Sequence, residues 1–181
     1  MACLITSGRK IPCKSAVGGI KNIFFADYGT LGDATIAAGE ITAFAGTPDW
    51  FQFDIKNTAT TMETAITSSR DNGTTFYDTT LSMTLTFQDK ATQEQLKLLA
   101  VARPHVAVED YNGNYWVVGL YNGGDVNGGT IVTGGAMGDL TGYTLTINAQ
   151  ETAPPYFVTP AVITADIAGG ASTPTQINPT A

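Results

Sequence analysis

The 181-residue sequence has little of what enzymes and metal proteins use, with only two cysteines and one histidine. A structural zinc site takes about four Cys, His or carboxylate ligands, so this supply predicts no metal centre. His105 stands alone after Pro104, and no G-x-S-x-G motif occurs, so neither a general base nor a serine nucleophile is indicated. The glycine-rich stretch lacks the lysine of a phosphate-binding loop. We expect a protein that is not an enzyme and that binds no cofactor.

Positive charge is also scarce, because nine Lys and Arg face sixteen Asp and Glu, for a net charge of −7. This balance argues against stable binding of nucleic acid phosphates. An acidic surface can still face DNA in a conduit, where repulsion keeps a passing polyanion moving. No apolar run is long enough for a membrane helix, and Arg9 and Lys10 stand where a signal peptide would be apolar. We expect no contact with a membrane.

The two cysteines, Cys3 and Cys13, lie ten positions apart near the start of the sequence. A disulfide is possible if the chain turns back at Gly8, whereas a reducing compartment favours two free, partly buried thiols. The sequence leaves their redox state open.

What is abundant is glycine and threonine, and with only 14% charged residues this composition favours a β-rich fold with many turns. Residues 81–87 alternate between apolar and small hydroxyl side chains, which predicts a strand with one core face and one polar face. The apolar members are Leu81, Met83, Leu85 and Phe87, and the hydroxyl members are Ser82, Thr84 and Thr86.

This strand belongs to a predicted long hairpin, in which residues 61–69 and 74–87 flank a turn signal at Asp71-Asn72-Gly73. We expect Met62 and Ile66 on the first arm to face the core. The opposite face then has two acidic side chains and no basic one. Its predicted members are Glu63, Ala65, Thr67, Ser69, Asp78, Thr80, Ser82, Thr84 and Thr86.

One helix is predicted over residues 89–102, capped by Asp89 or Thr92 and terminated by Pro104. Its apolar stripe is Leu96, Leu99 and Ala100.

A second hairpin is predicted from residues 106–110 and 115–121, through Asn112-Gly113. Glu109 and Asp110 point to opposite faces there, so they cannot act as a carboxylate pair and are expected to be rim charges. The other predicted strands are shorter or later in the chain, at 22–28, 41–44, 50–55 and from 143 to 148, with loops at 29–39 and 122–139.

These elements predict one mainly β domain, a β-sandwich or split barrel with one flanking α-helix, over residues 21–157. Residues 1–20 are expected to be an N-terminal leader, and residues 158–181 an extended C-terminal arm with an apolar stretch at 161–167.

Four segments resemble the major tail tube proteins of tailed bacteriophages, over roughly residues 50–157. They are DNGTTFYDTTLSMTLTF, ATQEQLKLLAVA, VAVEDYNGNYWVVGLYNGG and GGAMGDLTGYTLTINAQETAPP. The resemblance implies a subunit of the virion tail, made in the cytoplasm of the host bacterium, that forms hexameric rings stacked into a tube for DNA ejection. Its partners would be copies of itself and sheath, terminator, baseplate or tape-measure proteins, with DNA only in passage.

The resemblance also assigns roles to residues of the hairpin. The lumen would be lined by Glu63, Thr67, Asp78, Thr80, Ser82, Thr84 and Thr86, and rings would touch through Asp71, Asn72 and Gly73. The segments that would order on assembly are 1–20, 29–49, 122–139 and the tail after Pro155.

Two other functions stay open at this point. One is another virion part on a related fold, such as a tail terminator, an adaptor or a capsid decoration protein. The other is a glycan-binding module, for which five aromatic residues would form a platform, although aromatic residues in β-proteins more often pack in cores and subunit contacts. These residues are Trp50, Tyr111, Tyr115, Trp116 and Tyr121.

Overall fold

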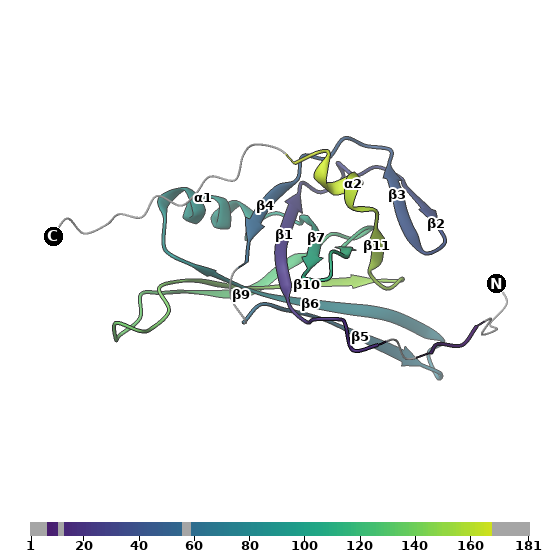
Figure 1. The fold of residues 1–181 in the computed structure, drawn as a ribbon, viewed down its shortest axis with the longest axis horizontal. Coiled ribbons are helices and arrows are strands. Elements are labelled where there is room, and N and C mark those ends of the chain that lie inside the picture. Colours follow the sequence, from purple (N-terminus) through teal and green to yellow (C-terminus); the bar gives the residue numbers. More distant parts are fainter. Residues whose placement is uncertain (1–6, 11–12, 56–58, 168–181) are drawn as a thin grey trace.

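The computed structural model describes residues 7–10, 13–55 and 59–167, and Figure 1 shows its elements. The strands are β1 (Ile20–Ala26), β2 (Ala34–Ala37), β3 (Glu40–Phe44), β4 (Phe51–Asp54), β5 (Thr61–Ser69), β6 (Thr74–Thr86), β7 (His105–Asp110), β8 (Tyr115–Val118), β9 (Asp125–Val132), β10 (Gly142–Glu151) and β11 (Tyr156–Val158). The helices are α1 (Lys90–Leu99) and α2 (Pro160–Thr164).

The strands form two sheets that lie face to face (Figure 1). The larger sheet has seven strands in the order β2, β3, β11, β8, β7, β1, β4, and the smaller has four in the order β5, β6, β10, β9. All pairs in the smaller sheet are antiparallel. The predicted fold class, mainly β with a flanking helix, is confirmed.

The main hydrophobic core fills the space between the sheets. The smaller sheet contributes the apolar side of β6 and β10, where Leu81, Met83 and Ile147 are fully buried. From the larger sheet, Ile23 and Phe25 of β1 point into the same core. Because side chains alternate along a strand, the intervening Phe24 points to the other side of that sheet.

A second core therefore lies on the far side of the seven-stranded sheet, and the C-terminal segment helps to cover it. Pro160 opens α2, whose Ile163 is fully buried, and Ile167 forms a bridge with Trp50. An extended arm was predicted from residue 158, but residues 158–167 instead pack on this core. The apolar stretch at 161–167 explains the difference, because its burial stabilises so short a helix. The rest of the predicted arm, 168–181, lies outside the described residues.

Helix α1 agrees closely with its prediction. Asp89 is the N-cap, and its carboxylate accepts a hydrogen bond from the Ala91 N–H at 3.2 Å. Leu96 and Leu99 are buried in the main core, so α1 covers one end of the layer between the sheets.

The predicted loop at 122–139 is in part a strand, β9, which pairs with β10. Its glycines obscured the strand pattern, yet Gly129 has a packing reason: a Cβ there would lie 2.5 Å from the Thr144 carbonyl oxygen. The predicted loop at 29–39 likewise contains β2.

The leader is exposed in its described part, residues 7–10 and 13–19, and contains no strand there. Cys13 is exposed rather than partly buried, and Cys3 lies outside the described residues.

In the β7–β8 hairpin, Glu109 and Asp110 are both buried. The prediction that they are rim charges is therefore wrong. Glu109 accepts hydrogen bonds from Lys21 Nζ at 2.7 Å and Asn22 Nδ2 at 2.5 Å. Asp110 accepts hydrogen bonds from the backbone and side chains of Asn112 and Asn114 in the turn. Burial alone would raise the pKa of Asp110, but these hydrogen bonds outweigh it and lower the pKa. Both carboxylates therefore hold the hairpin and its neighbouring strand in place.

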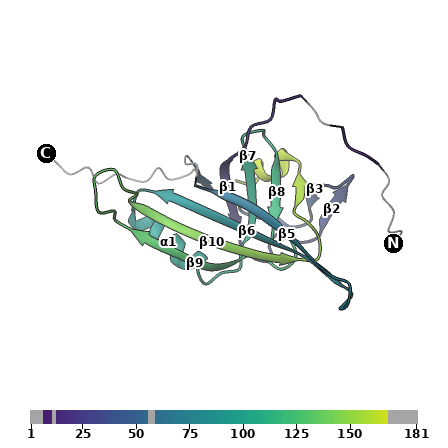
Figure 2. The same cartoon turned by 90° about the horizontal axis from the view of Figure 1, so that it is seen from below.

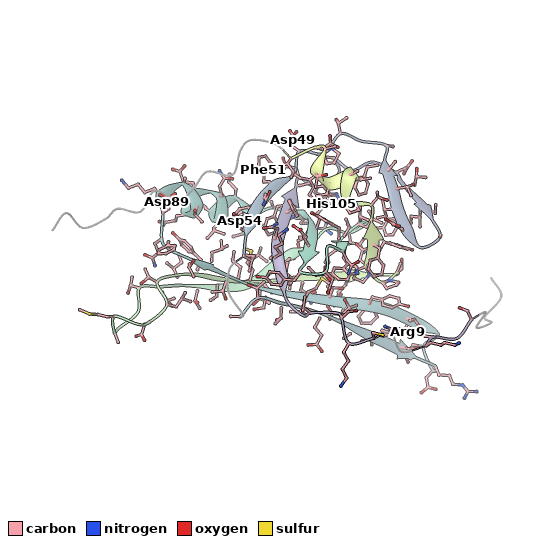
Figure 3. All side chains as sticks on the ribbon, viewed as in Figure 1. Arg9, Asp49, Phe51, Asp54, Asp89 and His105 are labelled. Atoms are coloured by element: carbon pink, nitrogen blue, oxygen red, sulfur yellow. The ribbon has the colours of Figure 1, made fainter. Side chains whose placement is uncertain are left out.

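His105 is buried in the interior of the molecule, where it joins two backbone segments (Figure 3). Its Nε2 accepts a hydrogen bond from the Gly29 N–H at 2.9 Å, which leaves Nδ1 to donate to the Gly119 carbonyl at 2.6 Å. Burial lowers its pKa below the ordinary 6.5, although the Gly119 carbonyl and Glu151 act in the other direction.

This arrangement predicts a loss of stability in mild acid. As pH falls through the pKa of the unfolded state, the unfolded chain takes up a proton before folded His105 does, so the free energy of unfolding decreases from pH 7 to 5. His105→Gln should flatten this dependence, measured by urea denaturation at each pH. Asp110, whose folded pKa is lowered, contributes only at pH near 4 and below, outside this window. If the free energy of unfolding of His105→Gln depended on pH as steeply as that of the unmodified protein, His105 would not be the source of the dependence.

Candidate functional site

The outer face of the four-stranded sheet, away from the main core, contains most of the predicted site residues. Figure 2 views the molecule from this side. We call it the polar face. Register places on it alternate residues of all four strands, mostly Ser, Thr, Asn and Gln. The strands of this sheet contain acidic residues but no lysine or arginine.

The structure brings most of the predicted lumen residues together on this face. Glu63 lies directly opposite Thr80 on the neighbouring strand, and Ser82 lies opposite Thr61. Asp78 shares the face, as do Thr67 nearer the turn and Thr86 at the other end of β6. Phe76, opposite Thr67, is the aromatic member of the face.

Thr84 differs from the prediction, because only 8% of its surface is exposed. Its backbone N–H donates a hydrogen bond to Thr60 Oγ1 at 3.2 Å, and Thr60 is buried as well. The segment that leads into β5 thus lies against this end of the face. Thr84 is therefore packed against this segment and is not an exposed residue of the polar face.

Strand β10 supplies a second row of polar side chains that sequence reasoning did not assign to the site. Its members, opposite β6, are Thr144, Thr146, Asn148 and Gln150. The alternation of residues 143–148 is a local pattern, but the pairing with β6 joins the four members of the row to residues 60 to 72 positions apart from them. On β9, Thr130 continues the row, and its hydroxyl lies 2.6 Å from that of Thr144.

Hydrogen bonds across the strands fix the acidic centre of the polar face. Asp78 accepts hydrogen bonds from Asn148 Nδ2 at 2.5 Å and from Gln150 Nε2 at 3.4 Å. Neither donor carries a charge, so the negative charge of Asp78 is not neutralised by them. At the β9 edge, Asp125 forms an ion pair with Arg103 at 3.6 Å. The face therefore keeps net negative charge.

The turn of the β5–β6 hairpin lies at one end of the molecule, the same end as β2 and β3 (Figure 1). Residues 70–73 form it, with Gly73 at a positive φ of 65°. The predicted inter-ring residues Asp71, Asn72 and Gly73 are all exposed there.

Two predicted core residues of the hairpin are exposed instead. Ile66 is on the inner face, in phase with Met62, but it is 68% exposed because the hairpin continues beyond the core. Phe87 is 53% exposed, because β6 ends at Thr86 and the backbone turns to a φ of 69°. Met62 packs against the main core as expected.

An open groove of about 720 Å³ lies between α1 and the end of β9 and β10. Its apolar lining includes Leu96 from the helix and Tyr143 and Leu145 from β10. Ile131 of β9, also part of the lining, is 64% exposed. Lys90 and Lys97 of α1 lie along the groove. We call it the α1–β9 groove.

The aromatic platform considered for a glycan-binding module is not present as predicted. Trp50 and Tyr115 are buried in the second core, and Trp116 packs against Phe157 with 5.2 Å between ring centroids. Tyr111 and Tyr121 are exposed. In the described ranges there is no group of three or more residues able to hold a metal ion, and no helix there is long and apolar enough to cross a membrane.

Comparison of the chain with family models, curated proteins and solved structures found no match. The fold and the polar face are therefore the basis for assigning a function.

Proposed function

We propose that the protein is a structural subunit of a bacteriophage tail tube, which assembles into stacked, hexameric rings with the polar face toward a DNA-conducting lumen. The observation that carries this proposal is the polar face itself. Its hydroxyl and amide groups form hydrogen bonds with water, and its carboxylates repel the phosphates of a passing duplex. The absence of lysine and arginine from the four strands removes the charge-assisted contacts that would retain DNA.

The edges of the same sheet support assembly. β5 and β9 are its two outer strands, and strand edges of this kind invite pairing with another chain. The antiparallel order β5, β6, β10, β9 makes β5 and β9 antiparallel to each other. A ring that pairs β9 of one copy with β5 of the next therefore continues the antiparallel pattern and closes the sheet into a barrel.

Sedimentation velocity over a concentration series tests the proposal. We expect the monomer to give way to one discrete ring species and then to larger, polydisperse stacks, because the edge strands and the ring faces are distinct contacts. A monomer at every concentration would contradict the proposal. A single small species that never stacks would instead favour a terminator, an adaptor or a decoration protein.

A further inference from the structure

The β5–β6 hairpin exposes apolar surface on its inner side, beyond the core. Ile66 on this side is 68% exposed, and Tyr77, directly opposite it, is only half-buried. Hydroxyl pairs brace the two arms on either side of these residues: Thr64 with Thr79 at 2.9 Å and Ser68 with Thr75 at 3.0 Å. The projecting part is thus a preformed two-stranded element with an apolar centre.

The α1–β9 groove has the complementary features. Its floor contains Tyr143 and Leu145, which are almost fully buried, and Ile131 offers further apolar surface. Gly128 and Gly129 lie along the same wall, so no side chain of theirs narrows the groove. Its volume of about 720 Å³ is large enough to admit several side chains.

The hairpin and the groove lie at opposite ends of the molecule. In Figures 1 and 2 the hairpin turn is at one end of the long sheet, while α1 and the β9–β10 ends are at the other. Figure 3 labels Asp89 at the start of α1, far from the hairpin. The two features cannot meet within one chain, but they can meet between copies arranged head to tail. A head-to-tail contact of this kind can repeat from copy to copy and build an open stack rather than a closed ring.

The net charges of the two features differ in sign. The hairpin over residues 61–86 has three acidic residues and one basic residue. Asp71 lies at the turn beside Arg70, whereas Glu63 and Asp78 lie on the polar face. The groove is bordered on α1 by Lys90 and Lys97, against one acid, Glu94.

The position of Lys90 adds to this complementarity. It occupies the first turn of α1, where a positive charge opposes the helix dipole. Neither lysine of the groove takes part in an ion pair within the described part of the chain. A carboxylate from another copy would form an ion pair with these lysines and offset the unfavourable interaction of Lys90 with the helix dipole.

We propose that the β5–β6 hairpin of one copy docks into the α1–β9 groove of the next copy along the tube axis, with Ile66 as its apolar anchor. This rests on the proposed function, since it requires copies to stack. It is a contact separate from the pairing of β5 and β9 edges within a ring. Asp71, at the turn, approaches the lysine border of the groove.

The first test compares Ile66→Asp with Leu98→Asp. Leu98 is a suitable control position, because it is 63% exposed on α1 and is not part of the groove lining. Both variants should fold, since neither side chain is buried. Ile66→Asp should leave rings intact and weaken ring–ring association by about tenfold or more. The reason is that aspartate cannot replace the apolar surface that Ile66 would bury in the groove. Leu98→Asp should stack like the unmodified protein.

The second test locates the contact by disulfide formation in a Cys3→Ser, Cys13→Ser background. Protein with Ile66→Cys is mixed with protein that has Ile131→Cys, and stacks are oxidised. We expect a cross-linked heterodimer, because a disulfide needs Cα atoms within about 7 Å. The pair of Ile66→Cys with Leu98→Cys should give none.

The outcomes separate the two proposals. Normal stacking of Ile66→Asp, or stacks without the Ile66–Ile131 cross-link, would overturn the docking proposal and leave the tube intact. A protein that forms no rings would overturn both.

Discussion

Leu81→Ala is expected to lower the free energy of unfolding by about 2–5 kcal/mol, among the largest effects of a single substitution in this chain. Leu81 is fully buried between the two sheets, directly opposite Ile147 on β10 and Met62 on β5. Truncation removes apolar contact with both strands and leaves a cavity that the paired sheets can only partly close. Urea denaturation measures the change as a lower midpoint at a similar slope.

Thr80→Ala is the matched control for this prediction. Thr80 is the next residue on the same strand, but it is exposed on the polar face, so the loss should stay below about 1 kcal/mol. Equal losses at the two positions would mean that the core does not lie on the odd-numbered side of β6.

The second large effect is expected from Thr80→Lys, which places a positive charge on the polar face without disturbing the core. A ring would present one such lysine per subunit, and stacked rings would repeat it along the lumen. Tubes of this variant should retain double-stranded DNA at low salt, with about one further phosphate contact per engaged lysine. Filter binding across a salt series measures this, because the affinity should fall steeply as salt rises.

Leu98→Lys supplies the control, since it adds the same charge on α1, away from the polar face. If tubes with Leu98→Lys retain DNA as strongly as tubes with Thr80→Lys, the polar face does not line the channel. Thr84, although it has a hydroxyl on the same strand, is unsuitable for this test, because a lysine there would replace a buried side chain.

The features that could be predicted from the sequence are those with local causes. The Asn-Gly turn and the period-two pattern after it fix the β5–β6 hairpin to within one residue, and Asp89 caps α1 as expected. Alternation also assigns Glu63 and Asp78 to one face, because side chains of a strand alternate regardless of its tertiary partners.

The features that could not be predicted depend on partners distant in sequence. The exposure of Ile66 follows from where the main core ends, and the burial of Thr84 from the path of the chain before β5. The β10 half of the polar face needs the pairing of Thr146 with Ser82, which no local signal encodes. β9 was missed because Gly128 and Gly129 lower the strand signal, although close contact with Thr144 explains a glycine there.

The most direct measurement is a cryo-electron microscopy reconstruction of the assemblies that the purified protein forms at high concentration. We expect hexameric rings with a central hole, lined by the polar face with Glu63, Asp78 and Thr80 toward the opening. Rings in which this face points outward, or a protein that remains monomeric, would contradict it.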